Sequence, residues 1–172
     1  MENLKQYILP FSGLSLGEHL FQFDIDEKFF AEFDYTEIDK ASVKVNITLE
    51  KQERMLIFDF NIHGILNVMC HRCLDNFDFP INDDERLIVK FGEEWLEEDE
   101  NIVIIPEHEG KFDVGKYIYE FIIVMIPFKI THPEDENGNS ECNPEIIKKL
   151  NELSTPGPKE TPWDGLKGLI IN

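Results

Sequence analysis

The stretch from residue 43 to residue 50 constrains the fold most, because apolar and polar side chains alternate along it without a break. Its apolar members are Val43, Val45, Ile47 and Leu49. Successive side chains of a β-strand point to opposite faces, so a period of two predicts a strand with one buried face and one solvated face. The same alternation returns at Leu87, Val89 and Phe91.

The segments around this strand predict a β-rich region. The predicted strands are residues 43–49, 55–62, 65–69, 74–81, 87–91 and 102–105. A break or bulge at His63-Gly64 and a turn at residues 82–84 divide them, and Pro106 ends the last one, which we expect to be a short edge strand. We predict an α+β fold, with an antiparallel β-meander or partial barrel over about residues 43–105.

Helices are predicted on either side of this region. Asp26 is a candidate N-cap for a short helix that ends at Phe30 or Phe33. Residues 113–126 predict a largely buried helix with Asp113 as its N-cap, although the isoleucine and valine content also fits a strand. A third helix is expected from Asn143-Pro144 to about Leu153. We therefore expect one α+β domain over residues 1–153, followed by a linker and C-terminal docking segment over residues 154–172.

The composition is that of a folded protein. The 172 residues include fourteen phenylalanines, which is enough apolar material for a hydrophobic core. Residues 1–6 lack the features of a signal peptide, and no apolar run has the length of a membrane span, so we expect a cytoplasmic protein. Three cysteines are an odd number, which argues against a disulfide framework and favours free thiols or metal ligands.

The net charge of −19 restricts the partners of the chain. Phosphate backbones repel such a protein, whereas a basic protein such as a ribosomal protein attracts it. Much of the charge lies in one acidic block: Glu93, Glu94, Glu97, Glu98, Asp99 and Glu100. This block is either a solvated loop or helix face, or an electrostatic platform for a cationic protein.

The spacing of Cys70 and Cys73 suits half of a zinc site, because a C-x2-C turn supplies two thiolates from one loop. His132 and Cys142 are the candidates for the other half, although nine intervening residues exceed the usual spacing. The alternatives are thiols packed as small apolar groups, or a redox pair in which Arg72 lowers a thiol pKa. Residues 135–139 resemble part of a calcium loop but predict a turn, since the closing glutamate is absent.

Several of these segments resemble the YceD-like family of large ribosomal RNA subunit accumulation proteins. They are Cys70-His71-Arg72-Cys73-Leu74, the apolar residues 120–127, the loop with His132 and Cys142, and residues 162–169 with Trp163. The resemblance implies a bacterial factor that supports accumulation of large-subunit ribosomal RNA, with no established enzymatic activity. Relatives are often encoded beside a small large-subunit ribosomal protein. Many of them carry a richer cysteine cluster than this chain, which keeps only Cys142 after the helix.

We therefore predict a non-enzymatic ribosome-biogenesis factor that supports accumulation of large-subunit rRNA and binds a basic ribosomal protein or a pre-ribosomal particle. Direct binding to rRNA is possible, but the negative net charge of the chain opposes it. The predicted binding residues are Cys70, Arg72, Cys73 and Trp163, and no catalytic residue is predicted. The predicted cofactor is none or zinc, with Cys70, Cys73, His132 and Cys142 as ligands. The alternatives are a zinc- or thiol-dependent enzyme that acts on RNA, and a chaperone-like domain without RNA contact.

Overall fold

The structure is a computed structural model that describes residues 3–33 and 38–154. Within it the chain forms two compact units, described here separately. Of the described residues, the first unit comprises 3–33, 38–69 and 76–130, and the second comprises 70–75 and 131–154. The expectation of a single domain over residues 1–153 stays a prediction.

The first unit is built on a six-stranded sheet with the strand order β2-β3-β4-β5-β7-β6. Its strands are β2 (Gly17–Ile25), β3 (Ile38–Lys51), β4 (Met55–Met69), β5 (Asn76–Gly92), β6 (Leu96–Asp99) and β7 (Ile102–Pro106). All neighbours are antiparallel except β5 and β7, which run parallel. The predicted α+β class and antiparallel meander are confirmed, and the sheet of the described residues is open rather than a closed barrel.

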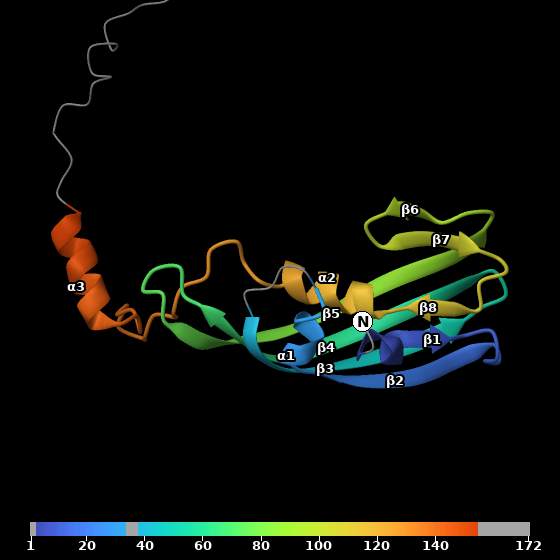
Figure 1. The fold of residues 1–172 in the computed structure, drawn as a ribbon, viewed down its shortest axis with the longest axis horizontal. Helices are drawn as coiled ribbons and strands as arrows, with labels where there is room; N and C mark the ends of the chain where they lie inside the picture. The colour runs from blue at the N-terminus through green and yellow to red at the C-terminus, as the bar shows by residue number, and fades with distance from the viewer. Residues whose placement is uncertain (1–2, 34–37, 155–172) are drawn as a thin grey trace, which may run out of the picture. The chain divides into compact units, whose positions relative to one another are not determined.

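The remaining elements of the first unit lie over one face of this sheet (Figure 1). They are a two-stranded sheet of β1 (Ile8–Pro10) and β8 (Lys111–Asp113), the 3-10 helix η1 (Asn3–Tyr7), and the helices α1 (Glu27–Phe30) and α2 (Gly115–Val124). The second unit contains the helix α3 (Pro144–Leu153). Every second residue is buried in β3 from Val43 to Leu49 and in β4 from Leu56 to Ile62, as the alternation predicts for β3.

The predicted interruptions of β4 and β5 are wrong, because both strands run straight through them. Gly64 pairs with Val43 on one side and Ile81 on the other. A Cβ at Gly64 would lie 2.3 Å from the carbonyl oxygen of Ser42, so this glycine permits close backbone approach instead of a break. Residues 82–84 pair with β4, and Asn61 Nδ2 donates to Asp84 Oδ1 at 2.7 Å. Pairing across the sheet thus overrides the turn preference of these polar residues.

The acidic block is neither a loop alone nor a helix face, because residues 96–99 form strand β6. Strand β7 also differs from the expected edge strand: it lies between β5 and β6. Ile102 pairs with Ile88 on the parallel side, and Ile104 pairs with Leu96 on the antiparallel side. The apolar β7 therefore takes the inner position and leaves the charged β6 at the edge.

The predicted helices are present with small shifts. Asp26 caps α1, with its Oδ1 accepting from the backbone N–H of Lys28 at 3.1 Å. Helix α2 is shorter than predicted and has Val114 as its N-cap, while Asp113 Oδ1 accepts from the backbone N–H of Gly115 at 2.8 Å. Helix α3 begins and ends as predicted, with Asn143 as its N-cap.

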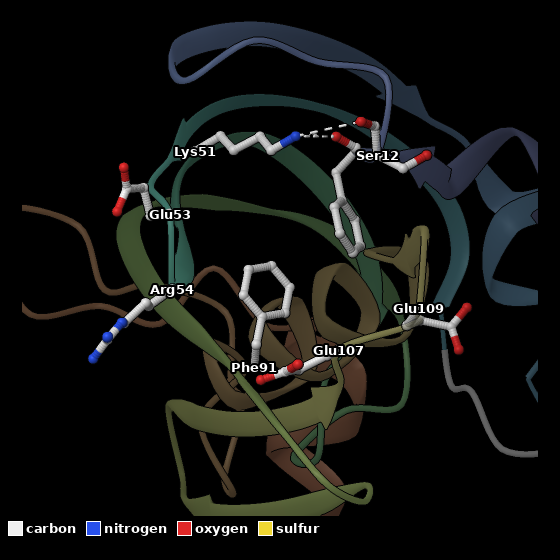
Figure 2. Close-up of a pocket in the computed structure, with 8 residues that line it drawn as sticks. Ser12, Lys51, Glu53, Arg54, Phe91, Glu107 and Glu109 are labelled. Atoms are coloured by element: carbon white, nitrogen blue, oxygen red, sulfur yellow. Dashed lines mark hydrogen bonds between the residues drawn. The ribbon is translucent and has the colours of Figure 1, made fainter.

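One lysine fastens the N-terminal loop of the first unit to the sheet. Lys51, at the end of β3, donates through Nζ to the carbonyl oxygens of Phe11 at 2.9 Å and Leu14 at 2.7 Å. A longer contact of 3.5 Å reaches the carbonyl oxygen of Ser12 (Figure 2). The ammonium group thereby provides hydrogen bonds to the carbonyl oxygens of a turn that follows β1, and these charge-assisted bonds stabilise the fold.

We expect Gly64→Ala to destabilise the protein by about 1–3 kcal/mol, since the added methyl group meets rigid backbone atoms of Ser42 and Val43. Urea denaturation followed by circular dichroism measures the change. Gly13→Ala is the control, because a Cβ there meets nothing within 4 Å. Equal stability of the two variants would contradict the close approach of β3 and β4.

Candidate metal centre

The second unit brings together the four side chains that the sequence singles out. Cys70 and Cys73 come from the short segment 70–75, and His132 and Cys142 come from the segment that begins at residue 131. Their ligand atoms all lie within 4.8 Å of one another. Cys70 Sγ lies 3.7 Å from Cys142 Sγ, and His132 Nδ1 lies 3.4 Å from Cys73 Sγ and 3.7 Å from Cys142 Sγ.

These separations fit the edges of a zinc tetrahedron. Bond lengths of about 2.3 Å for Zn–S and about 2.0–2.1 Å for Zn–N give edges of about 3.8 Å between two sulfurs and about 3.6 Å between sulfur and nitrogen. These three of the six separations differ from the tetrahedral edges by about 0.2 Å or less, and all six are within 4.8 Å. A Cys3His donor set is also among the usual sets of structural zinc sites. The residues present therefore fit this metal in both chemistry and spacing.

A tight turn presents the first two thiols. The backbone N–H of Leu74 donates to the carbonyl oxygen of Cys70 at 2.9 Å, and the backbone N–H of Cys70 donates to the carbonyl oxygen of Asp75 at 3.0 Å. The backbone N–H of Arg72 points at Cys70 Sγ over 3.4 Å. Leu74 takes a φ of 65°, a left-handed conformation that is uncommon for a residue with a side chain. The turn thus directs backbone N–H dipoles at a sulfur that a metal would require as a thiolate.

The long spacing between His132 and Cys142 is explained by a closed loop. Glu134 and Ser140 form an antiparallel bridge, so the residues between them fold back on themselves. Asp135 holds the tip: its Oδ1 accepts from the backbone N–H groups of Asn137 at 2.9 Å and Asn139 at 2.7 Å. These hydrogen bonds also lower the pKa of Asp135. Because its carboxylate is used in this way, residues 135–139 are a turn, as the sequence predicts.

The thiols are electrostatically unequal in the absence of a metal. Burial raises the pKa of Cys70, but hydrogen bonds from the backbone of Cys73, Arg72 and His132 and from the His132 side chain outweigh it and lower the pKa to about 5. Burial raises the pKa of Cys142, and the neighbouring thiols Cys70 and Cys73 raise it further. One thiolate therefore disfavours a second beside it, and a divalent cation is the group that would remove this repulsion.

The three thiols are also the buried residues of the second unit. Among its described residues, only Cys70, Cys73 and Cys142 are buried, with exposed fractions of 4 % or less. Helix α3 buries none of its side chains. A unit this small without an apolar core requires another source of stability, and a bound metal is a common one.

Polar contacts around the cluster were not anticipated from the sequence. Asn143 Nδ2 donates to Asp75 Oδ2 at 3.1 Å, while its Oδ1 accepts from the backbone N–H of Glu145 at 3.1 Å. Asn143 therefore joins the cysteine turn to the start of α3. Ser140 Oγ accepts from the backbone N–H of Cys142 at 3.2 Å. The Asn-Pro pair signals a helix start, but no sequence pattern indicates the partner at Asp75.

The sequence also predicts Arg72 and Trp163 as binding residues. Arg72 is half-buried, and no ion pair links it to an acidic residue that the structure describes. His71 is exposed and is not a member of the cluster. Trp163 lies outside the described residues. The structure thus brings the predicted metal ligands together and leaves the role of Trp163 a prediction.

A hollow of about 630 Å³ in the first unit has no comparable set of converging groups. Lys51 on its wall is already bonded to carbonyl oxygens, and Glu53, Arg54 and Glu109 point away from its centre (Figure 2). Phe91 contributes an aromatic ring, which pairs with Phe11 at 5.8 Å between ring centres. The hollow therefore combines two aromatic rings with charged residues that do not converge on a ligand position.

These features define a mostly β-sheet protein with a cluster of three buried cysteines and one half-buried histidine. The chain belongs to the family described as large ribosomal RNA subunit accumulation protein YceD, which it matches over residues 58–170, more than half of its length. This confirms the resemblance found in the sequence. Comparison with curated proteins and with solved structures found no match. No helix in the described part of the chain has the length and apolar character needed to cross a membrane.

We propose that Cys70, Cys73, His132 and Cys142 hold one zinc ion. Protein purified without chelator is expected to carry about one zinc per chain, measured by elemental analysis, and Cys142→Ser is expected to carry much less. In the cobalt-substituted protein, the thiolate-to-metal absorption should weaken in the same variant.

His71→Ala is the matched control, because His71 lies in the same turn but outside the cluster. It should retain zinc. A native chain that binds no zinc, or a Cys142→Ser variant that keeps all of it, would contradict the proposed ligand set.

Proposed function

We propose that this protein is a non-enzymatic ribosome-biogenesis factor that supports accumulation of large-subunit rRNA by binding a basic ribosomal protein or a pre-ribosomal particle. The single observation that carries the proposal is the family match over residues 58–170, which includes all four residues of the cluster. A factor of this kind acts where ribosomes assemble, so we also propose a cytoplasmic location.

The geometry of the cluster supports a structural role over catalysis. A catalytic zinc site keeps one position open for water or substrate, whereas a structural site is closed by four protein ligands. The cluster offers four protein ligands, and its three thiols are buried. The alternative of a zinc-dependent enzyme acting on RNA would require a ligand position that this set does not leave free.

The cysteine turn is the part of the second unit that suits recognition. It presents Leu74, which is 67 % exposed, beside the half-buried Arg72. A guanidinium group binds phosphate or carboxylate through a planar pair of N–H donors. In this proposal the metal fixes the turn, and Arg72 and Leu74 make the contact.

The charge of the chain favours a protein as the direct partner. With a net charge of −19, the molecule repels the phosphates of naked RNA, and binding through many phosphate contacts is disfavoured. Ribosomal proteins are commonly basic and are attracted by such a surface. In this proposal the protein delivers or protects a ribosomal protein that the large subunit requires, and large-subunit rRNA accumulates as a consequence.

We expect that cells deprived of this protein contain less large-subunit rRNA relative to small-subunit rRNA. Quantification of both rRNAs before and after depletion measures the effect. Re-expression of the native chain or of His71→Ala should restore the ratio, whereas Cys70→Ser with Cys142→Ser should not.

Protein levels of each variant are measured in the same cells, so that loss of the chain itself is distinguished from loss of function. An unchanged rRNA ratio after complete depletion would defeat the proposal. Restoration by the double cysteine variant at native protein level would remove the cluster from the mechanism.

A further inference from the structure

Strand β6 forms one edge of the six-stranded sheet. It pairs with β7 on its inner side, and no strand of the described residues pairs with its outer side (Figure 1). An edge strand presents a row of backbone N–H and C=O groups that another extended segment can use. The outer side of β6 is therefore a place where a strand can be added.

The chain around β6 is exposed along its whole length. All residues from 93 to 100 are exposed, including the apolar side chains of Trp95 at 52 % and Leu96 at 53 %. Exposure of large apolar side chains to water is unfavourable. Exposed apolar groups that are surrounded by polar residues mark interaction sites.

Trp95 is held in place by an aromatic stack. Its ring lies nearly parallel to that of Phe112, with 6.3 Å between centres and an angle of 5°. Phe112 in turn stacks on the fully buried Phe58 at 5.2 Å. The indole is thus anchored to the core although half of it remains exposed. An anchored tryptophan suits the role of a binding hot spot, and its face attracts cationic groups.

The charges around β6 are only partly neutralised within the protein. Glu97 binds Lys116 at 2.6 Å, and Glu98 binds Lys90 at 2.6 Å. In the described part of the chain, no ion pair is formed by Glu93, Glu94, Asp99 or Glu100. A segment that adds to this edge therefore meets uncompensated negative charge on both flanks of the strand.

We propose that the outer edge of β6 binds an extended segment rich in lysine and arginine from a partner protein, which adds to the sheet as a further strand. Backbone hydrogen bonds along β6 supply the pairing, Trp95 and Leu96 supply apolar contact, and Glu94 and Asp99 select a cationic sequence. The identity of the partner, a basic component of the assembling particle, rests on the proposed function. The inference adds which surface of this protein binds that partner and how.

The same features disfavour a second copy of this chain as the occupant. A second copy of this chain would bring an equally acidic β6 against the first, and opposed like charges are destabilising across a strand pair. The opposite edge of the sheet, β2, is longer but carries only Glu18 and Asp24 as acidic residues over nine positions. It has the same kind of free backbone without the concentrated charge, and it serves as the comparison edge.

The first test uses the full-length native chain and two synthetic peptides. One is a short fluorescent peptide that alternates lysine or arginine with valine, and the other has the same sequence with alternate backbone nitrogens methylated. Methylation keeps the charge but removes the donors that strand pairing requires. Fluorescence polarisation at physiological salt should show about tenfold or more weaker binding of the methylated peptide.

The second test compares two charge-reversal variants with the same change in net charge. Glu94→Lys with Asp99→Lys should weaken binding of the unmethylated peptide by about tenfold or more, whereas Glu18→Lys with Asp24→Lys on β2 should change it by less than about threefold. Trp95→Ala should also weaken binding by about tenfold, as expected for a hot-spot tryptophan. Thermal melting of each variant verifies that it folds as the native chain does.

Three outcomes would overturn the inference: equal binding of both peptides, equal losses in the β6 and β2 variants, or tighter binding of a single-stranded RNA of similar length than of the peptide. Equal binding of both peptides would show that charge alone explains the affinity, and this result is obtained with the native chain. These failures leave the depletion experiment untouched, because rRNA can depend on the protein without strand addition at β6. Conversely, selective peptide binding with unchanged rRNA after depletion would defeat only the proposed function.

Discussion

The pairing of β4 with its two neighbours is the constraint on which the first unit depends. β4 is hydrogen-bonded along most of its fifteen residues to β3 on one side and to β5 on the other. This ladder places Phe58, Phe60 and Ile62 on one face, where they are almost fully buried. At Gly64 the backbone of β4 lies so close to that of β3 that a side chain there would press on Ser42 and Val43 and disturb the pairing of these two strands.

The second unit is organised by a different principle. Its described residues bury three thiols and little else, so hydrophobic burial contributes little to its stability. Hydrogen bonds position the cluster: Asn143 joins Asp75 to the start of α3, and Asp135 closes the loop between His132 and Cys142. A proposed zinc ion would provide the binding free energy that a core provides elsewhere, because metal binding and folding are coupled in such units. The same ion would hold Arg72 and Leu74 in a fixed turn for recognition.

Sequence reasoning succeeded where the local signal and the tertiary contacts agree. The alternation in residues 43–49, the Asp26 cap and the helix after Asn143 are all present as predicted. It failed where tertiary pairing opposes a local preference. Residues 82–84 have strong turn preference, yet they lie within β5 because β4 supplies partners for them. The acidic block has the composition of a solvated segment, yet residues 96–99 form a strand because they pair with the apolar β7.

The sequence by itself determined the α+β class, the family and the four candidate ligands, because periodicity and residue type are local properties of the chain. Only the tertiary structure decided that nine intervening residues close into a loop that returns Cys142 to His132, at 3.7 Å between sulfur and nitrogen. It also decided that β6, and not β7, forms the edge of the sheet. Both results depend on contacts between residues that are remote or non-periodic in sequence, and such contacts are set by the packing of the whole unit, which no local pattern records.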